Sequence, residues 1–185
     1  MPLAVFLLAA NIPGLVKGNF TADTALPATS LGCRSMEALW VEAQAVPSAA
    51  LVPCVRPLPV GWTFAHANAG SGGSVITLDS DRAGAGALQL TLTAHCRTGD
   101  ATQVASPVPG VRRFAARPAT GGGYSPSWYD RFPGGCVTIQ LHSPSRLAAI
   151  DAGLPHQAML ILGYVPRGVL QQALQQRSSG LLHLT

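Results

Sequence analysis

The chain has 185 residues, which is the length of one domain, with or without a short tail. Hydrophobic residues make up 48% of it and charged residues 11%, which excludes a disordered chain, a coiled coil and an acidic tail. The formal net charge of +4 comes from 12 Lys and Arg against 8 Asp and Glu. These cations are too sparse for the dense basic surface that binds nucleic acid, so we expect no nucleic-acid partner.

The N-terminal segment, residues 1–16, is apolar and has no charged side chain before Lys17. A membrane-spanning helix needs about 20 apolar residues, and a secretory signal begins with basic residues. We therefore expect an incomplete export or anchor segment that associates with the membrane, and a protein that is exported, membrane-anchored or secreted. A buried helix at the start of the domain is the alternative. Residues 17–32 read as a linker, and we predict a single extracytoplasmic domain over residues 33–185.

The first predicted elements are one helix and then three strands. A helix is expected from an N-cap at Ser35 through about Val46, with one apolar face, and Pro47 ends it. Strands are predicted over residues 51–55, 74–78 and 88–94, the last from its strict alternation of apolar and polar residues. The predicted apolar helix face is Met36, Leu39, Trp40 and Ala43, and the predicted turn between the last two strands is residues 79–86.

The second half of the chain contains a long stretch rich in glycine, proline and arginine, which predicts an irregular segment that is functional or mobile. Strands and helices follow it in sequence. The irregular segment is residues 97–135, the strands are 136–142 and 158–164, and the helices are 145–152 and 167–177. This order predicts an α+β fold, with a small antiparallel or mixed sheet and helices packed mainly on one face.

Four cysteines are spaced widely, without a Cys-x-x-Cys pair, so the signature of structural zinc and of thioredoxin-type redox sites is absent. We predict the disulfides Cys33–Cys54, which brackets the first helix, and Cys96–Cys136, which joins two strands. Four buried free thiols are the alternative. Strand alternation counts against the second pair, because it puts Cys96 on the apolar face and Cys136 on the polar face. Disulfides would indicate an oxidising compartment.

An aromatic and arginine cluster within residues 97–135 is the predicted binding site. Aromatic and arginine side chains supply contact area and planar hydrogen bonding at binding hot spots, and a pair of neighbouring arginines could also hold an anion. The alternative is that the cluster folds back to cover the sheet. Its members are Arg112, Arg113, Tyr124, Trp128, Tyr129 and Arg131.

Catalytic motifs are missing from the sequence. There is no Gly-x-Ser-x-Gly nucleophile motif, the five histidines have no metal-binding spacing, and the loop that starts at Asp79 lacks the later ligands of a calcium site. We therefore predict no catalytic residue, no metal and no cofactor. The expected function is a non-enzymatic extracytoplasmic domain that binds a membrane-protein or cell-envelope partner. An envelope hydrolase with a dispersed His, Asp and Ser site is the alternative.

Several short motifs resemble a group of uncharacterised exported or membrane-anchored actinobacterial proteins. The resemblance covers roughly residues 33–170 and implies a domain outside the membrane with all four cysteines in disulfides. It implies no activity and no catalytic residues. The motifs are Cys33 with the helix EALWVEAQAVPSA, Val52-Pro53-Cys54, Leu58-Pro59-x-Gly61-Trp62, Phe132-Pro133-Gly134-Gly135-Cys136-Val137 and Gly163-Tyr164-Val165-Pro166-Arg167.

Overall fold

The computed structural model describes residues 33, 36–118 and 123–184. The expected export segment, the linker and the N-cap at Ser35 lie outside the described residues. The elements are α2 (Met36–Ala45), β1 (Leu51–Val55), β2 (Trp62–Gly70), β3 (Gly73–Ser80), β4 (Gly84–Thr93), β5 (Thr102–Val104), β6 (Arg112–Ala116), β7 (Ser127–Phe132), β8 (Gly135–Leu141), α3 (Arg146–Asp151), α4 (Leu154–Ile161), β9 (Leu162–Pro166) and α5 (Arg167–Arg177).

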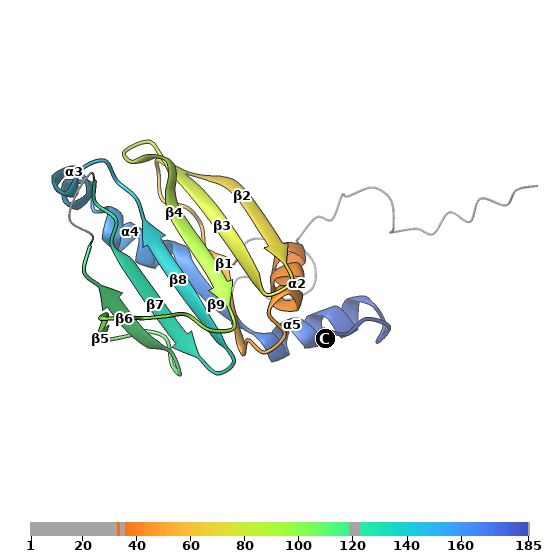
Figure 1. The fold of residues 1–185 in the computed structure, drawn as a ribbon. Coiled ribbons are helices and arrows are strands. Elements are labelled where there is room, and N and C mark those ends of the chain that lie inside the picture. The colour runs from red at the N-terminus through yellow and green to blue at the C-terminus, as the bar shows by residue number, and fades with distance from the viewer. Residues whose placement is uncertain (1–32, 34–35, 119–122, 185) are drawn as a thin grey trace, which may run out of the picture.

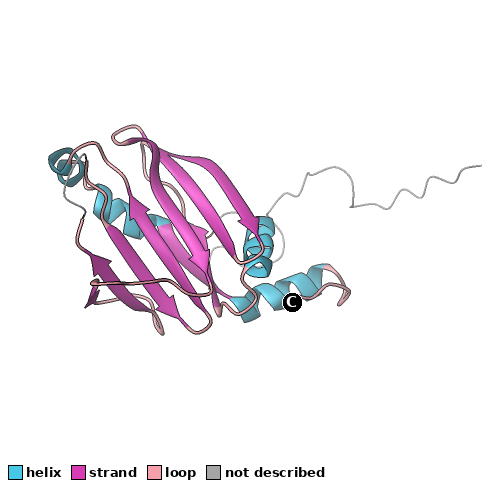
Figure 2. Ribbon diagram, in the orientation of Figure 1, coloured by secondary structure: helices cyan, strands magenta, loops and turns pink. Residues whose placement is uncertain are grey.

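The main sheet has seven antiparallel strands in the spatial order β2-β3-β4-β8-β7-β6-β5. Strands β1 and β9 pair with each other, also antiparallel, in a separate two-stranded sheet. Figures 1 and 2 show the main sheet face on, with α4, β1 and β9 behind it. We call this covered side the inner face and the opposite side the outer face. The predicted α+β class, the antiparallel sheet and the placement of the helices are confirmed.

The main core lies between the inner face and α4. Alternate residues of β4 and β8 are buried there, because successive side chains of a strand point to opposite faces. Helix α4 adds Leu154, Ala158 and Ile161, spaced by about one turn. Each fully buried Leu or Ile contributes about 1.5–3 kcal/mol. The buried strand residues are Leu88, Leu90, Leu92, Val137, Ile139 and Leu141.

Both predicted disulfides are present, and the described part of the chain has no free cysteine. Cys33–Cys54 joins the segment before α2 to β1. Cys96–Cys136 is possible because β4 ends at Thr93 and the chain bends before Cys96, so strand alternation does not extend to it. Cys136 lies on the outer face but is only 1% exposed.

The prediction that residues 97–135 are irregular is wrong, because this stretch contains β5, β6 and β7. These strands have only 3, 5 and 6 residues, and the charged residues of β6 and β7 interrupt the alternation of apolar and polar residues that usually marks a strand. Strand β2 was also missed. It lies at the edge of the sheet, and every residue after Trp62 is exposed, so it has no apolar alternation.

The predicted strand over residues 158–164 is also wrong, because the run divides between α4 and β9 at Ile161. The residues on both sides of this boundary are buried, so periodicity could not separate helix from strand. The turn predicted over residues 79–86 is shorter, since β3 continues to Ser80 and β4 begins at Gly84. The other predicted elements are confirmed, and in the structure Ser145 is the N-cap of α3.

Candidate functional site

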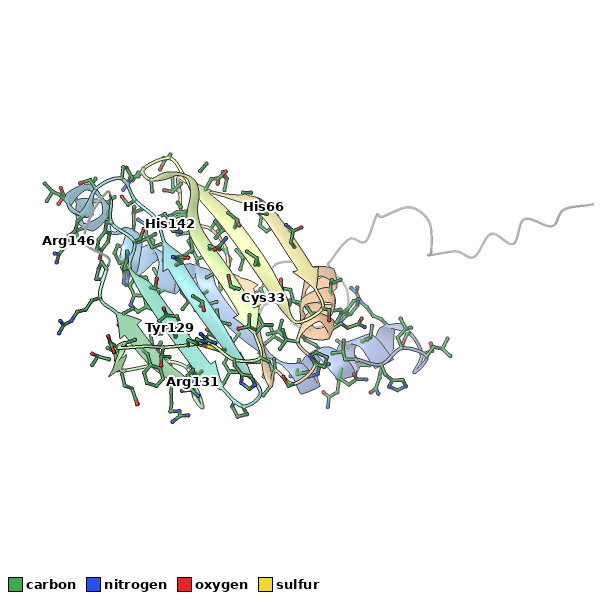
Figure 3. The ribbon with its side chains drawn as sticks, in the orientation of Figure 1. Cys33, His66, Tyr129, Arg131, His142 and Arg146 are labelled. Atoms are coloured by element: carbon green, nitrogen blue, oxygen red, sulfur yellow. A yellow bond between two sulfur atoms is a disulfide. The ribbon has the colours of Figure 1, made fainter. Side chains whose placement is uncertain are left out.

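The register of β6 and β7 assembles part of the predicted cluster. Arg112 lies opposite Arg131, and Phe114 lies opposite Tyr129. Because side chains alternate between the faces of a strand, these four residues share the outer face. Figure 3 places Tyr129 and Arg131 at the far end of the sheet from His66 of β2.

Two arginines that face each other across a strand pair repel each other unless an anion or a partner lies between them. Arg112 and Arg131 are both exposed. The guanidinium carbon of Arg131 lies 6.0 Å from the centre of the Phe114 ring, at the limit of a cation–π contact. This contact keeps Arg131 beside the ring and leaves the hydrogen-bonding edge of Arg112 open to solvent.

A polar hollow of about 590 Å³ lies beside Tyr129, on the outer face of β7. Tyr129 lines it and so connects the hollow to the strand pair, while Arg97 and Arg117 add two more exposed cations. Asp100 is the one carboxylate among the residues that line it. The Cys96–Cys136 disulfide attaches the near end of the hollow to β8. The full lining is Arg97, Thr98, Gly99, Asp100, Ala101, Ala116, Arg117 and Tyr129.

We call this surface the Arg–aromatic face. It carries four arginines with one carboxylate, which favours an anionic ligand, because guanidinium groups form paired hydrogen bonds with carboxylates and phosphates. Its members are Arg97, Arg112, Phe114, Arg117, Tyr129 and Arg131.

The other three residues of the predicted cluster do not join this face. Arg113 lies between Arg112 and Phe114 in β6, so its side chain points to the inner face, where it is only 7% exposed. Tyr124 and Trp128 are half-buried and pack against the main core. Arg113 and Trp128 belong to β6 and β7 and point to the inner face, and Tyr124 packs against the main core.

Arg113 belongs to a buried polar network on the inner side. Its Nε and Nη2 atoms each donate to Asp130 over 2.6 Å, and the hydroxyl of Tyr164 also donates to Asp130 over 2.6 Å. Asp130 is fully buried. Its hydrogen bond with Arg113 raises the arginine pKa, and burial raises the Tyr164 pKa well above its ordinary value. The network joins β6, β7 and β9, so it has a structural role.

Among the described residues, a serine and a histidine form an arrangement that resembles a nucleophile with its base. The Oγ of Ser125 lies 3.1 Å from Nδ1 of His142, and both residues are half-buried. Figure 3 shows His142 near the end of β8. Within residues 36–118 and 123–184, no hydrogen bond joins His142 to a carboxylate, so the third group of a hydrolase triad is not in place.

Comparisons of the chain with protein-family models, curated proteins and solved structures found no match. No group of three or more His, Cys, Asp or Glu residues capable of holding a metal ion occurs among the described residues. In the same part of the chain, no helix is long and apolar enough to cross a membrane.

Sequence reasoning missed Arg97, Phe114 and Arg117 as members of the site. The signal for Phe114 is the sequence Arg112-Arg113-Phe114, in which alternate residues would share a face if the segment were a strand. Arg97 has no comparable local signal. It reaches the hollow because the disulfide at Cys96 holds the following loop against β8.

Proposed function

We propose that this protein is a non-enzymatic extracytoplasmic domain that binds an anionic polysaccharide of the cell envelope through the Arg–aromatic face. The observation that carries the proposal is the placement of Arg112 directly opposite Arg131, beside a hollow with two further arginines. An extended acidic chain would relieve the repulsion between these cations, and the exposed parts of Phe114 and Tyr129 offer flat surfaces beside it.

The proposed compartment rests on the two disulfides, which form and persist in oxidising environments outside the cytoplasm. The resemblance to exported actinobacterial proteins and the apolar residues 1–16, proposed as an export or anchor segment, agree with it. Alkylation and non-reducing mass spectrometry of the protein from membrane and soluble fractions test the compartment. Four alkylated thiols in cells would contradict it.

The binding proposal is tested by titrating the purified protein with polygalacturonate, neutral dextran and polyglutamate. We expect polygalacturonate to bind more tightly than dextran, and to bind less tightly as the salt rises from about 50 to 200 mM. Polyglutamate carries the same charge without sugar rings. If it binds equally well, acidic proteins are the partner class rather than polysaccharides.

Two matched pairs of variants distinguish binding at the Arg–aromatic face from non-specific attraction to the protein's positive charge. Arg112→Gln with Arg131→Gln should weaken polygalacturonate binding by about a hundredfold or more, since each lost hydrogen bond to a charged group costs about 1.5–3 kcal/mol. The control pair, Arg82→Gln with Arg146→Gln, removes the same charge from exposed positions elsewhere, as Figure 3 shows for Arg146. Equal losses in both pairs would contradict the proposed site.

A second candidate function is hydrolysis, and the observation that favours it is the 3.1 Å contact between Ser125 and His142. If His142 acts as a base for Ser125, the serine should be labelled covalently by a fluorophosphonate probe. Ser125→Ala would abolish the labelling, while Ser127→Ala would not. Absence of labelling in the unmodified protein would exclude this function for the pair.

A further inference from the structure

A second, apolar cavity of about 320 Å³ lies between α2, β1 and the strands β2 and β3. Every residue that lines it is apolar or part of a disulfide, except Glu42. Phe64 lines the cavity and is yet 55% exposed, so the cavity opens to solvent beside β2. The lining residues are Ala38, Leu39, Glu42, Cys54, Val55, Leu58, Phe64, Ala67 and Ile76.

Glu42 is the one ionisable side chain in this lining. It is 4% exposed, and its Oε2 atom has no hydrogen-bond partner in the described part of the chain. Leaving a buried polar group unpaired costs about 1–3 kcal/mol, and more for a charged group. A buried carboxyl group at the wall of an apolar cavity, with one oxygen that no protein group satisfies, therefore points to a ligand that completes its hydrogen bonds.

Within the described part of the chain, no charged side chain of the neighbouring elements forms an ion pair with Glu42. From α5, the guanidinium of Arg167 donates to the carbonyl oxygen of Ala43, and that of Arg177 lies over the ring of Trp40. From β2, His66 is exposed and is not part of the lining. The lining residues from β1 and β3 carry no charge. Burial alone raises the pKa of Glu42 to about 8, in agreement with this isolation.

We propose that this cavity binds a small amphiphilic amine, whose apolar body fills the cavity and whose protonated amino group pairs with the Glu42 carboxylate. A carboxylate only accepts hydrogen bonds, so its complement is a donor that carries positive charge. The volume is at the lower end of the range for ligand pockets, which suits a small molecule rather than a polymer.

Binding of such an amine is coupled to loss of the proton from Glu42. Only the ionised carboxylate pairs with the ammonium group, and its fraction rises about tenfold for each pH unit below the pKa of about 8. The amine itself stays protonated, because alkylammonium groups have pKa values near 10. The affinity should therefore increase roughly tenfold between about pH 6 and pH 7.

The experiment is a titration of the ¹⁵N-labelled, disulfide-intact protein with hexylamine, hexanol and hexanoate, followed by amide chemical shifts. These probes share one apolar chain and differ in charge. We expect hexylamine to bind more tightly than hexanol, hexanoate to bind weakest, and shifts to centre on α2, β1 and β2. Glu42→Gln should remove both the preference for the amine and its pH dependence, while hexanol binding remains.

A second variant tests whether the ligand occupies the cavity without changing Glu42. Ala67→Leu places bulk in the cavity from the exposed strand β2, and it should weaken the binding of hexylamine and hexanol together. The proposal is overturned if hexylamine shifts no residue near the cavity, if it binds no better than hexanol, or if its affinity in Glu42→Gln still rises with pH. Because the Arg–aromatic face shares no residue with the cavity, these results do not depend on polysaccharide binding.

Discussion

Glu42 should make the stability of this protein fall as the pH rises, and Glu42→Gln should remove that dependence. The side chain is 4% exposed, and burial raises its pKa from 4.5 to about 8. Between these two values the unfolded chain has released the carboxyl proton, whereas the folded chain keeps it. The folded state therefore binds one more proton than the unfolded state in this interval.

The sign and size of the effect follow from this difference. Stabilisation by the neutral carboxyl is complete below pH 4.5 and is lost as the pH rises through about 8. One proton of difference corresponds to about 1.4 kcal/mol per pH unit, so the free energy of unfolding should fall by roughly 2–3 kcal/mol between pH 5 and pH 7. This is a large share of the typical total of about 5–15 kcal/mol.

The assay is urea unfolding of the disulfide-intact protein at several pH values between about 5 and 7. Glutamine has the shape of the protonated glutamate and cannot ionise, so the variant should be the more stable protein at neutral pH. Asp151→Asn, which removes an exposed carboxylate at the end of α3, is the control and should leave the slope unchanged. Parallel stability curves for the unmodified protein and Glu42→Gln would refute the reasoning.

Three further changes should destabilise the fold, and chemical unfolding measures each. Asp130→Asn leaves its buried arginine partner without a counter-ion and should cost about 3–5 kcal/mol, while Asp100→Asn on the surface should cost little. Replacing both Cys96 and Cys136 by alanine opens a loop with a sequence separation of 40 and should cost roughly 3–4 kcal/mol. Gly134→Ala should cost more than Gly110→Ala: both glycines have positive φ, but only at Gly134 would the new Cβ lie 1.7 Å from a backbone oxygen. Equal losses at the two glycines would contradict the clash.

The parts of the fold that sequence predicted are those with aliphatic alternation or helix signals. Leu88 to Leu92 and Val137 to Leu141 alternate because one face of β4 and of β8 is buried and the other is not. Ser145 caps α3, and Gly153, with a φ of 65°, ends the turn after it. Each of these signals lies within one short segment, so it can be recognised without knowing the tertiary structure.

The sequence predicts which types of residue form the candidate site, but not which of them the fold brings together. Arg131 faces Arg112 because β7 pairs with β6 in one register, and that register is a property of two segments rather than one. Asp130 has a clearer signal, since it alternates with the half-buried Trp128 and the buried Phe132 and therefore requires a buried partner.

Glu42 was missed for a related reason. A single apolar face predicts a helix covered on one side, with Leu39 and Ala43 inward. Helix α2 instead contacts β1, β2, β3 and α5, so residues beyond that face are covered as well. The burial of Glu42 results from this tertiary packing, so it could not be predicted from the sequence of the helix alone.

The two disulfides have more than a stabilising role in this arrangement, because each ends at one of the two proposed sites. Cys54 lines the apolar cavity, and Cys96 directly precedes Arg97 of the polar hollow. The main core between β4, β8 and α4 contains neither bond, because Cys136 lies on the outer face of β8. Reduction should therefore loosen the loop after β4 and the N-terminal attachment of α2 before it melts the sheet. Both binding surfaces thus depend on the oxidising compartment that the proposed function requires.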